Sequence, residues 1–145
     1  MNRRSVLKML AGGAGLLSGL MPLTALANKL MGKRDPIDAI KAITGGLQSA
    51  SDKLILKTPK LAENGAQVPI TVDATALDGV KSISLVVHEN PKPVALKINF
   101  DSSDVVTFAS FRVKMGKPTK VTAIAQTASG FVTASGSTKV TKGGC

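Results

Sequence analysis

The stretch SISLVVHENPKPVALKINF, residues 82–100, decides the fold class. It holds two apolar runs, 82–87 and 94–100, in which apolar residues recur at every second position. Between them lies Asn90-Pro91, a pair typical of turns. A period of two residues is the period of a β-strand that buries one of its faces. The stretch therefore predicts two short β-strands, separated by a turn.

Similar short runs, rich in Val, Ile and Thr, lie on both sides of this stretch. We expect further strands at 54–56, 68–72, 105–114, 119–126 and 131–141, the last ending near Val140. About seven strands that each bury one face predict an all-β fold, an immunoglobulin-like antiparallel β-sandwich over residues 53–140. The sequence has no tryptophan and a single cysteine, so it lacks the buried Trp and the disulfide of true antibody domains. Only the general architecture is predicted.

A short helix is expected before the first strand, within an N-terminal helix and linker over 28–52. Asp35 can cap its first turn, and Pro36 suits the first helical position. One face of the helix is apolar, formed by Ile37, Ile40 and Ile43. Gly45-Gly46 should end it. We expect this face to pack on the sandwich or on a partner.

Residues 1–27 have the features of a signal peptide. Arg3-Arg4 resembles the twin-arginine motif, and a moderately apolar segment, 9–20, follows that is too short to span a bilayer. Ala25-Leu26-Ala27 has the small-x-small pattern of a cleavage site, which would start the mature chain at Asn28. We therefore expect twin-arginine export to the periplasm, with no stable membrane association. A retained N-terminal anchor is the alternative.

The chain is basic, with 19 Lys and Arg against nine Asp and Glu. Loss of Arg3, Arg4 and Lys8 with the leader would leave 16 basic residues and a net charge of +7. No run of Lys and Arg resembles a nucleic-acid-binding stripe, and four phenylalanines are the only aromatic residues. We expect no nucleic-acid partner. Scattered lysines that keep the domain soluble are the simplest explanation, together with a weak attraction for anions.

Cys145 is the single cysteine of the sequence, and Gly143-Gly144 precede it. Exported proteins normally use cysteines in pairs, so an unpaired one is expected to be buried, bonded to another chain or kept for reaction. The glycines predict a flexible, narrow arm over 141–145 with a reach of roughly 15 Å. Such a thiol cannot belong to the core, but it can enter a pocket of another protein. An intermolecular disulfide that only links an exported partner-binding module to its partner is the alternative function.

The sequence offers little for an enzyme or a metal protein. A blue-copper site needs two histidines beside its cysteine, and His88 is the single histidine. No Gly-x-Ser-x-Gly motif is present, and Cys145 has one possible histidine partner. We predict no catalytic residue, no bound metal and no cofactor.

Several motifs, taken in order, resemble the SoxY family, the sulfur-carrier subunit of the thiosulfate-oxidising Sox system. The similar features are the twin-arginine leader, Ile43-Thr44-Gly45-Gly46, Ala62-Glu63-Asn64-Gly65 leading into Val68-Pro69-Ile70, His88-Glu89-Asn90-Pro91-Lys92-Pro93, and Gly143-Gly144-Cys145. The resemblance covers essentially the whole mature chain. The family's usual ending is Gly-Gly-Cys-Gly-Gly, and this sequence stops at the cysteine.

The resemblance implies a covalent carrier rather than an enzyme. By that implication Cys145 is the attachment site for thiosulfate-derived intermediates, and Gly143 and Gly144 form the arm. A c-type cytochrome would join the substrate to the thiol, a hydrolase would release sulfate, and other Sox enzymes would process the remaining sulfur. The resemblance also implies a heterodimer with a SoxZ-like β-sandwich subunit. We expect the partner-facing surface near 81–88 and 94–100, the most apolar strands.

Overall fold

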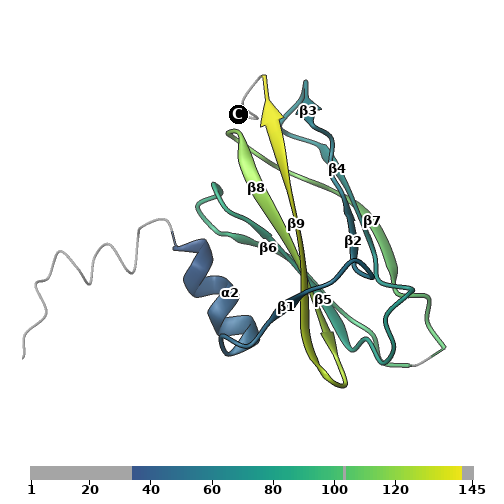
Figure 1. Cartoon of the computed structure of the whole chain (residues 1–145). Helices are drawn as coiled ribbons and strands as arrows, with labels where there is room; N and C mark the ends of the chain where they lie inside the picture. Colours follow the sequence, from purple (N-terminus) through teal and green to yellow (C-terminus); the bar gives the residue numbers. More distant parts are fainter. Residues whose placement is uncertain (1–33, 103, 142–145) are drawn as a thin grey trace, which may run out of the picture. The chain divides into compact units, whose positions relative to one another are not determined.

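The computed structural model describes residues 34–102 and 104–141 (Figure 1). Cys145, Gly143, Gly144 and the expected leader, 1–27, lie outside the described residues. The described parts hold one helix and nine strands: α2 (Pro36–Thr44), β1 (Ser49–Ala50), β2 (Ile55–Lys57), β3 (Leu61–Ala62), β4 (Val68–Asp73), β5 (Ser82–Val87), β6 (Val94–Asn99), β7 (Phe108–Val113), β8 (Thr119–Thr127) and β9 (Gly130–Val140).

The strands form two sheets that pack face to face as a β-sandwich (Figure 1). The larger sheet has the order β1-β9-β8-β5-β6, with β3 also paired to β9. The smaller sheet has the order β2-β4-β7. The seven longer strands pair antiparallel, which confirms the predicted all-β sandwich. The two strands that the periodicity did not predict, β1 and β3, have two residues each and run parallel to β9.

The core fills the space between the two sheets. From β4, every second residue points inward and is fully buried: Val68, Ile70 and Val72. The facing sheet contributes Ile83, Leu85 and Val87 from β5, and alternate residues of β8 complete the layer. Met115, in the loop between β7 and β8, is also completely buried in this cluster. Alternation along the strands thus gives one continuous core.

The helix α2 forms as its sequence predicts. The Asp35 carboxylate accepts a hydrogen bond from the Ile37 backbone N–H at 2.7 Å, and Pro36 occupies the first turn. Gly45 ends the helix with φ of 66°, a left-handed conformation that glycine adopts without strain. Ile40 packs against Val86 and Ile124 on the outer face of the larger sheet. Ile40, with half-buried Ile43 beside it, therefore packs on the sandwich itself, while Ile37 of the same predicted face stays exposed.

The alternating sequence of β5 predicts one buried face and one exposed face, but the helix helps to bury the second face. All six residues of β5 are buried, because one face lies in the core and the other is covered from outside. Val86 lies under α2, and the Ser82 hydroxyl donates to the Gln126 side-chain oxygen at 3.1 Å. Of the two strands in the predicted partner-facing surface near 81–88 and 94–100, β5 is buried, while the residues of β6 stay exposed or half-buried. No helix in the described part of the chain is long and apolar enough to cross a membrane.

Candidate functional site

The end of β9 fixes the point from which the last residues of the chain depart. β9 ends at Val140, which pairs with Ala62 of β3. The Thr141 N–H donates to the Ala62 carbonyl at 3.1 Å, and the Lys139 N–H donates to the Lys60 carbonyl at 3.0 Å. This short parallel pairing holds the chain in place up to the last described residue. The predicted attachment site Cys145 and arm residues Gly143 and Gly144 follow outside the described residues.

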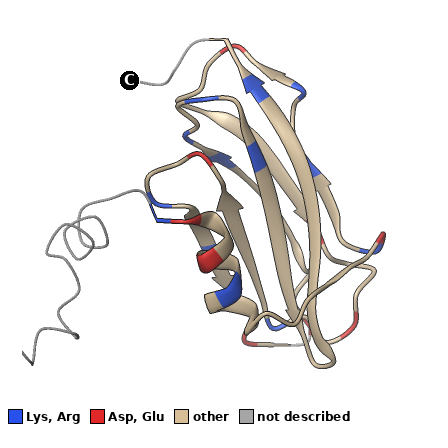
Figure 2. Cartoon of the chain, turned by 60° about the vertical axis from the view of Figure 1, so that its left-hand side comes forward, with Lys and Arg blue, Asp and Glu red and all other residues tan. Residues whose placement is uncertain are grey.

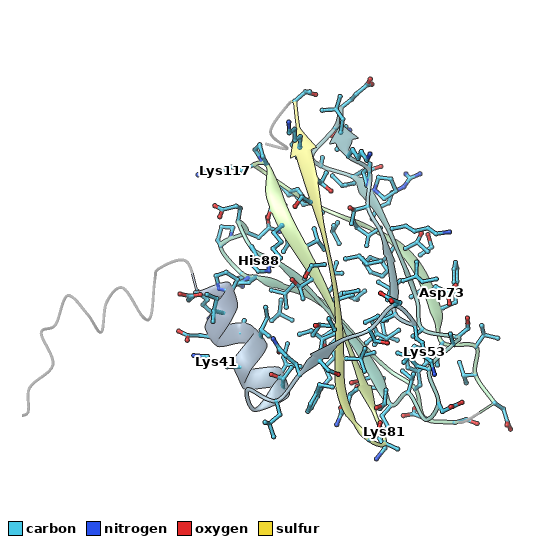
Figure 3. All side chains as sticks on the ribbon, viewed as in Figure 1. Lys41, Lys53, Asp73, Lys81, His88 and Lys117 are labelled. Carbon is cyan, nitrogen blue, oxygen red and sulfur yellow. The ribbon has the colours of Figure 1, made fainter. Side chains whose placement is uncertain are left out.

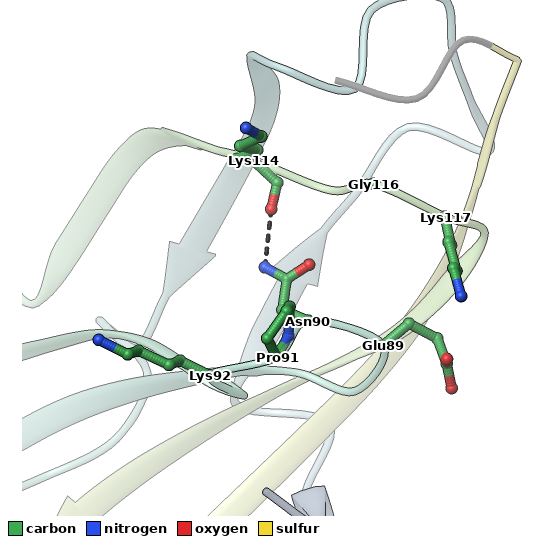
Figure 4. Close-up of a pocket in the computed structure, with 7 residues that line it drawn as sticks. All are labelled: Glu89, Asn90, Pro91, Lys92, Lys114, Gly116 and Lys117. Carbon is green, nitrogen blue, oxygen red and sulfur yellow. Dashed lines mark hydrogen bonds between the residues drawn. The ribbon is translucent and has the colours of Figure 1, made fainter. Parts of the chain in front are cut away.

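Three loops surround this exit and are connected by hydrogen bonds. The Met115 N–H donates to the Gly65 carbonyl at 2.7 Å, which connects the β7–β8 loop to the loop after β3. The Asn90 side-chain amide donates to the Lys114 carbonyl at 2.8 Å, which connects the β5–β6 loop to the same β7–β8 loop (Figure 4). Buried Met115 anchors the arrangement from below. The loops therefore form a connected platform at the end of the sandwich where β9 finishes.

A hollow of about 630 Å³ opens between the β5–β6 and β7–β8 loops (Figure 4). Three lysines and one glutamate line it, together with residues of the two loops. The full lining consists of Glu89, Asn90, Pro91, Lys92, Lys114, Gly116 and Lys117. The lysine side chains are exposed. The hollow thus combines apolar surface from Pro91 and the lysine stems with several positive charges.

A polar chain lies on the outer face of the larger sheet, beside this platform. His88 Nε2 and Thr122 Oγ1 lie 2.9 Å apart, and Thr122 Oγ1 lies 3.0 Å from Ser135 Oγ. Burial lowers the pKa of His88 below its ordinary value, and the positive charge of Lys120 acts in the same direction. The imidazole is therefore neutral near pH 7 and serves as a hydrogen-bonding group of the sheet.

Among the described residues, no group of three or more His, Cys, Asp or Glu side chains could hold a metal ion. The one histidine of the sequence is instead used in the polar chain with Thr122. The described part of the site thus consists of an anchored exit, a lysine-bearing hollow and connected loops.

Comparison with known proteins shows first the fold and then the family. Among solved structures, the fold is similar to a superoxide reductase (neelaredoxin) from Ignicoccus hospitalis, with 18% identity, a TM-score of 0.52, and coverage of 60% of this chain and 79% of that one. That likeness shows a shared β-sandwich fold alone. None of the curated proteins matches the chain.

A second solved structure is more similar in both sequence and fold. It is the sulfur carrier protein SoxY from Chlorobium limicola f thiosulfatophilum, with 30% identity, a TM-score of 0.64, and coverage of 72% of this chain and 94% of that one. The family model described as "Sulfur oxidation protein SoxY" matches residues 40–145. The chain belongs to the SoxY family.

The sequence motifs led to the family, but they did not predict the lysine-bearing hollow. Its residues come from two segments that the sequence marks as turns, around Asn90-Pro91 and Gly116-Lys117-Pro118. Each lysine alone resembles ordinary solvated charge. Only the pairing of β5, β6 and β8 brings the two segments together.

Proposed function

We propose that this protein is a periplasmic sulfur carrier that holds thiosulfate-derived intermediates covalently on Cys145. The observation that carries the proposal is the SoxY family match, which extends over residues 40–145 and so includes the cysteine and both arm glycines. The similar solved structure is that of a sulfur carrier protein. The anchored end of β9 supports the proposal, because it gives the terminal residues a fixed starting point.

The proposed chemistry has two steps at the thiol. In the first, the Cys145 thiolate and thiosulfate form a sulfur–sulfur bond and release two electrons, which a c-type cytochrome accepts. In the second, a hydrolase uses water to release sulfate, which leaves one sulfane sulfur on Cys145 and sets protons free. The carrier supplies the thiolate, which is the reactive form of cysteine, and catalyses neither step.

The proposed carrier is located in the periplasm and works as a heterodimer. The twin-arginine pattern at Arg3-Arg4 and the Ala25-Leu26-Ala27 site support export of a folded protein to the periplasm. Membership of the SoxY family supports a heterodimer with a SoxZ-like subunit. The exposed strand β6, at the edge of the larger sheet, is the open part of the surface predicted for that subunit.

A reconstituted assay tests the function. Thiosulfate-dependent reduction of the cytochrome is measured with purified Sox enzymes, the SoxZ-like subunit and either the wild-type carrier or Cys145→Ser. We expect the variant to lose essentially all reduction, because serine forms no sulfur–sulfur bond.

A matched control is Ser137→Ala, which changes an exposed side chain of β9 and leaves the terminus intact. It should keep wild-type activity. Equal activity of wild type and Cys145→Ser would overturn the proposal and would favour a structural, partner-binding module.

A further inference from the structure

The two ends of the sandwich carry opposite charge. At the end where β9 finishes, the loops and adjoining strand ends hold six lysines and two glutamates: Lys60, Lys92, Lys114, Lys117, Lys120, Lys139, Glu63 and Glu89. At the opposite end, the described residues hold five aspartates and two lysines: Asp52, Asp73, Asp78, Asp101, Asp104, Lys53 and Lys81. We call the first set, which consists of the loop regions 58–67, 88–93 and 114–120 and the end of β9 at 138–141, the exit end.

The strand pairing establishes that these residues share an end. Val68 pairs with Val113, Val87 pairs with Val121, and Thr119 pairs with Thr138, so three loops meet at the end of β9. Figure 2 shows basic segments concentrated toward the end of the ribbon where β9 finishes. In Figure 3, Lys117 lies toward that end and Lys81 lies at the other.

The lysines of the exit end are exposed, while the backbone beneath them is held in place. All six lysine side chains are exposed. The His88 N–H donates to the Lys120 carbonyl at 3.0 Å, and the Glu89 N–H donates to the Thr119 hydroxyl at 3.0 Å. With the bonds of Met115 and Asn90 described above, these contacts fix the loops that carry the lysines. The charges thus lie on an ordered surface. Docking therefore has a smaller entropic cost, because few loop residues must become ordered on binding.

We propose that the exit end is an electrostatic docking surface for acidic protein surfaces around the active-site entrances of the enzymes that receive the arm. This inference rests on the proposed function. A carrier visits several enzymes in turn, so it needs fast association and ready release rather than tight binding. Complementary charge acts mainly by raising the association rate and leaves dissociation fast, and it orients the approaching partner. Here the positive charge lies at the end from which the chain continues toward Cys145.

The hollow gives the surface a shape as well as a charge. It lies within the exit end and carries three of its six lysines, Lys92, Lys114 and Lys117. A projecting acidic side chain of a partner would find lysine ammonium groups at the rim and the Pro91 ring in the wall (Figure 4). Such a contact fixes the orientation in which the arm reaches the entrance.

The test measures association without chemistry. Every sample is a complex of the carrier with its SoxZ-like subunit, and the carrier has the substitution Cys145→Ser so that no chemistry occurs. Surface plasmon resonance measures the binding of this complex to the immobilised sulfate-releasing hydrolase at several salt concentrations. The test variant is Lys92→Gln/Lys114→Gln/Lys117→Gln. The control, Lys41→Gln/Lys53→Gln/Lys81→Gln, removes the same charge from exposed positions outside the exit end.

We expect the association rate constant of the test variant to fall about tenfold at low salt and to lose much of its salt dependence. The control variant should stay within about twofold of the parent. Equal effects of the two variants would overturn the inference, since net charge alone would then account for them. No effect of either variant would also overturn it.

Two further outcomes separate this inference from its alternatives. If free sulfate or thiosulfate shifts the amide resonances of Lys114 and Lys117 at millimolar concentration while the test variant associates normally, the lysines serve a small anion and the docking surface is contradicted. Formation of a sulfur adduct on Cys145 tests the proposed function separately. A wild-type carrier that forms no adduct overturns that function even where the association data are as expected.

Discussion

Thr119 and Thr138 lie opposite each other on β8 and β9, and their hydroxyl groups are satisfied differently. The Thr119 hydroxyl accepts from the Glu89 N–H at 3.0 Å and donates to the Lys120 carbonyl at 3.0 Å. The buried Thr138 hydroxyl has no hydrogen-bond partner among the described residues. Burial of a polar group without a partner costs free energy, so the two positions should respond oppositely to loss of the hydroxyl.

Valine has nearly the shape of threonine, which makes it the substitution that isolates the hydroxyl. We expect Thr138→Val to raise the free energy of unfolding by about 1 kcal/mol, and Thr119→Val to lower it by about 1–2 kcal/mol. Urea unfolding followed by circular dichroism measures both. A loss of stability in Thr138→Val comparable to that in Thr119→Val would contradict this account of the pair.

His88 makes stability depend on pH. Burial and Lys120 lower the pKa of His88, while Glu89 and Asp35 oppose the shift. The unfolded chain therefore binds a proton at His88 at a higher pH than the folded chain. The stabilising contribution is complete above the ordinary pKa of about 6.5, and it is lost as the pH falls below that value toward the lower pKa of the folded state.

We expect the free energy of unfolding of the wild type to decrease between about pH 7.5 and about pH 5.5. His88→Gln keeps a hydrogen-bonding side chain near Thr122 but has no charge to gain, so its decrease over that window should be smaller. Denaturant titrations at a series of pH values provide the comparison. Parallel curves for the two proteins would show that His88 does not cause the dependence.

Among the secondary-structure elements, the helix α2 packs on the larger sheet mainly through one buried apolar residue, Ile40. Ile40 is 9% exposed and packs with Val86 and Ile124, whereas Ile37 is 57% exposed on the same helix. Figure 1 shows the helix beside the larger sheet. The helix therefore gains most of its stability from a small apolar cluster on the outer face.

The two isoleucines give a matched pair of variants. Ile40→Ala should lower the free energy of unfolding by about 2–3 kcal/mol, because it leaves a cavity over Val86 and Ile124. Ile37→Ala should change it by less than about 0.5 kcal/mol. Equilibrium unfolding measures both, and similar losses in the two variants would mean that the packing of α2 is not centred on Ile40.

The sequence predicted the elements well where a local pattern encodes them. All seven predicted runs form strands. The helix begins after Asp35 and ends before Gly45, as these residue types indicate. The strands β1 and β3 were missed, because two residues are too few for a period, and their pairing with β9 comes from distant parts of the chain. The burial of both faces of β5 was missed for a similar reason. It depends on where α2 docks, which no local pattern states.

Across the whole molecule, the thiol and the family could be predicted from the sequence, but the separation of charge between the two ends could not. Cys145 and its two glycines are contiguous, so they can be recognised directly. The lysines of the exit end are spread over residues 60–139 and look scattered along the chain. Antiparallel pairing brings alternate loops to the same end of a sandwich, and only the topology shows which charges gather there.

Intact mass spectrometry detects directly whether Cys145 carries thiosulfate-derived sulfur, as the proposed function requires. The mature protein is isolated without reductant from cells exposed to thiosulfate, beside a Cys145→Ala variant. The proposed function predicts mass increases of one or more sulfur atoms, or of a thiosulfate group, in the wild type and none in the variant. A wild-type protein found only as a free thiol or a stable disulfide dimer, with and without thiosulfate, would contradict it.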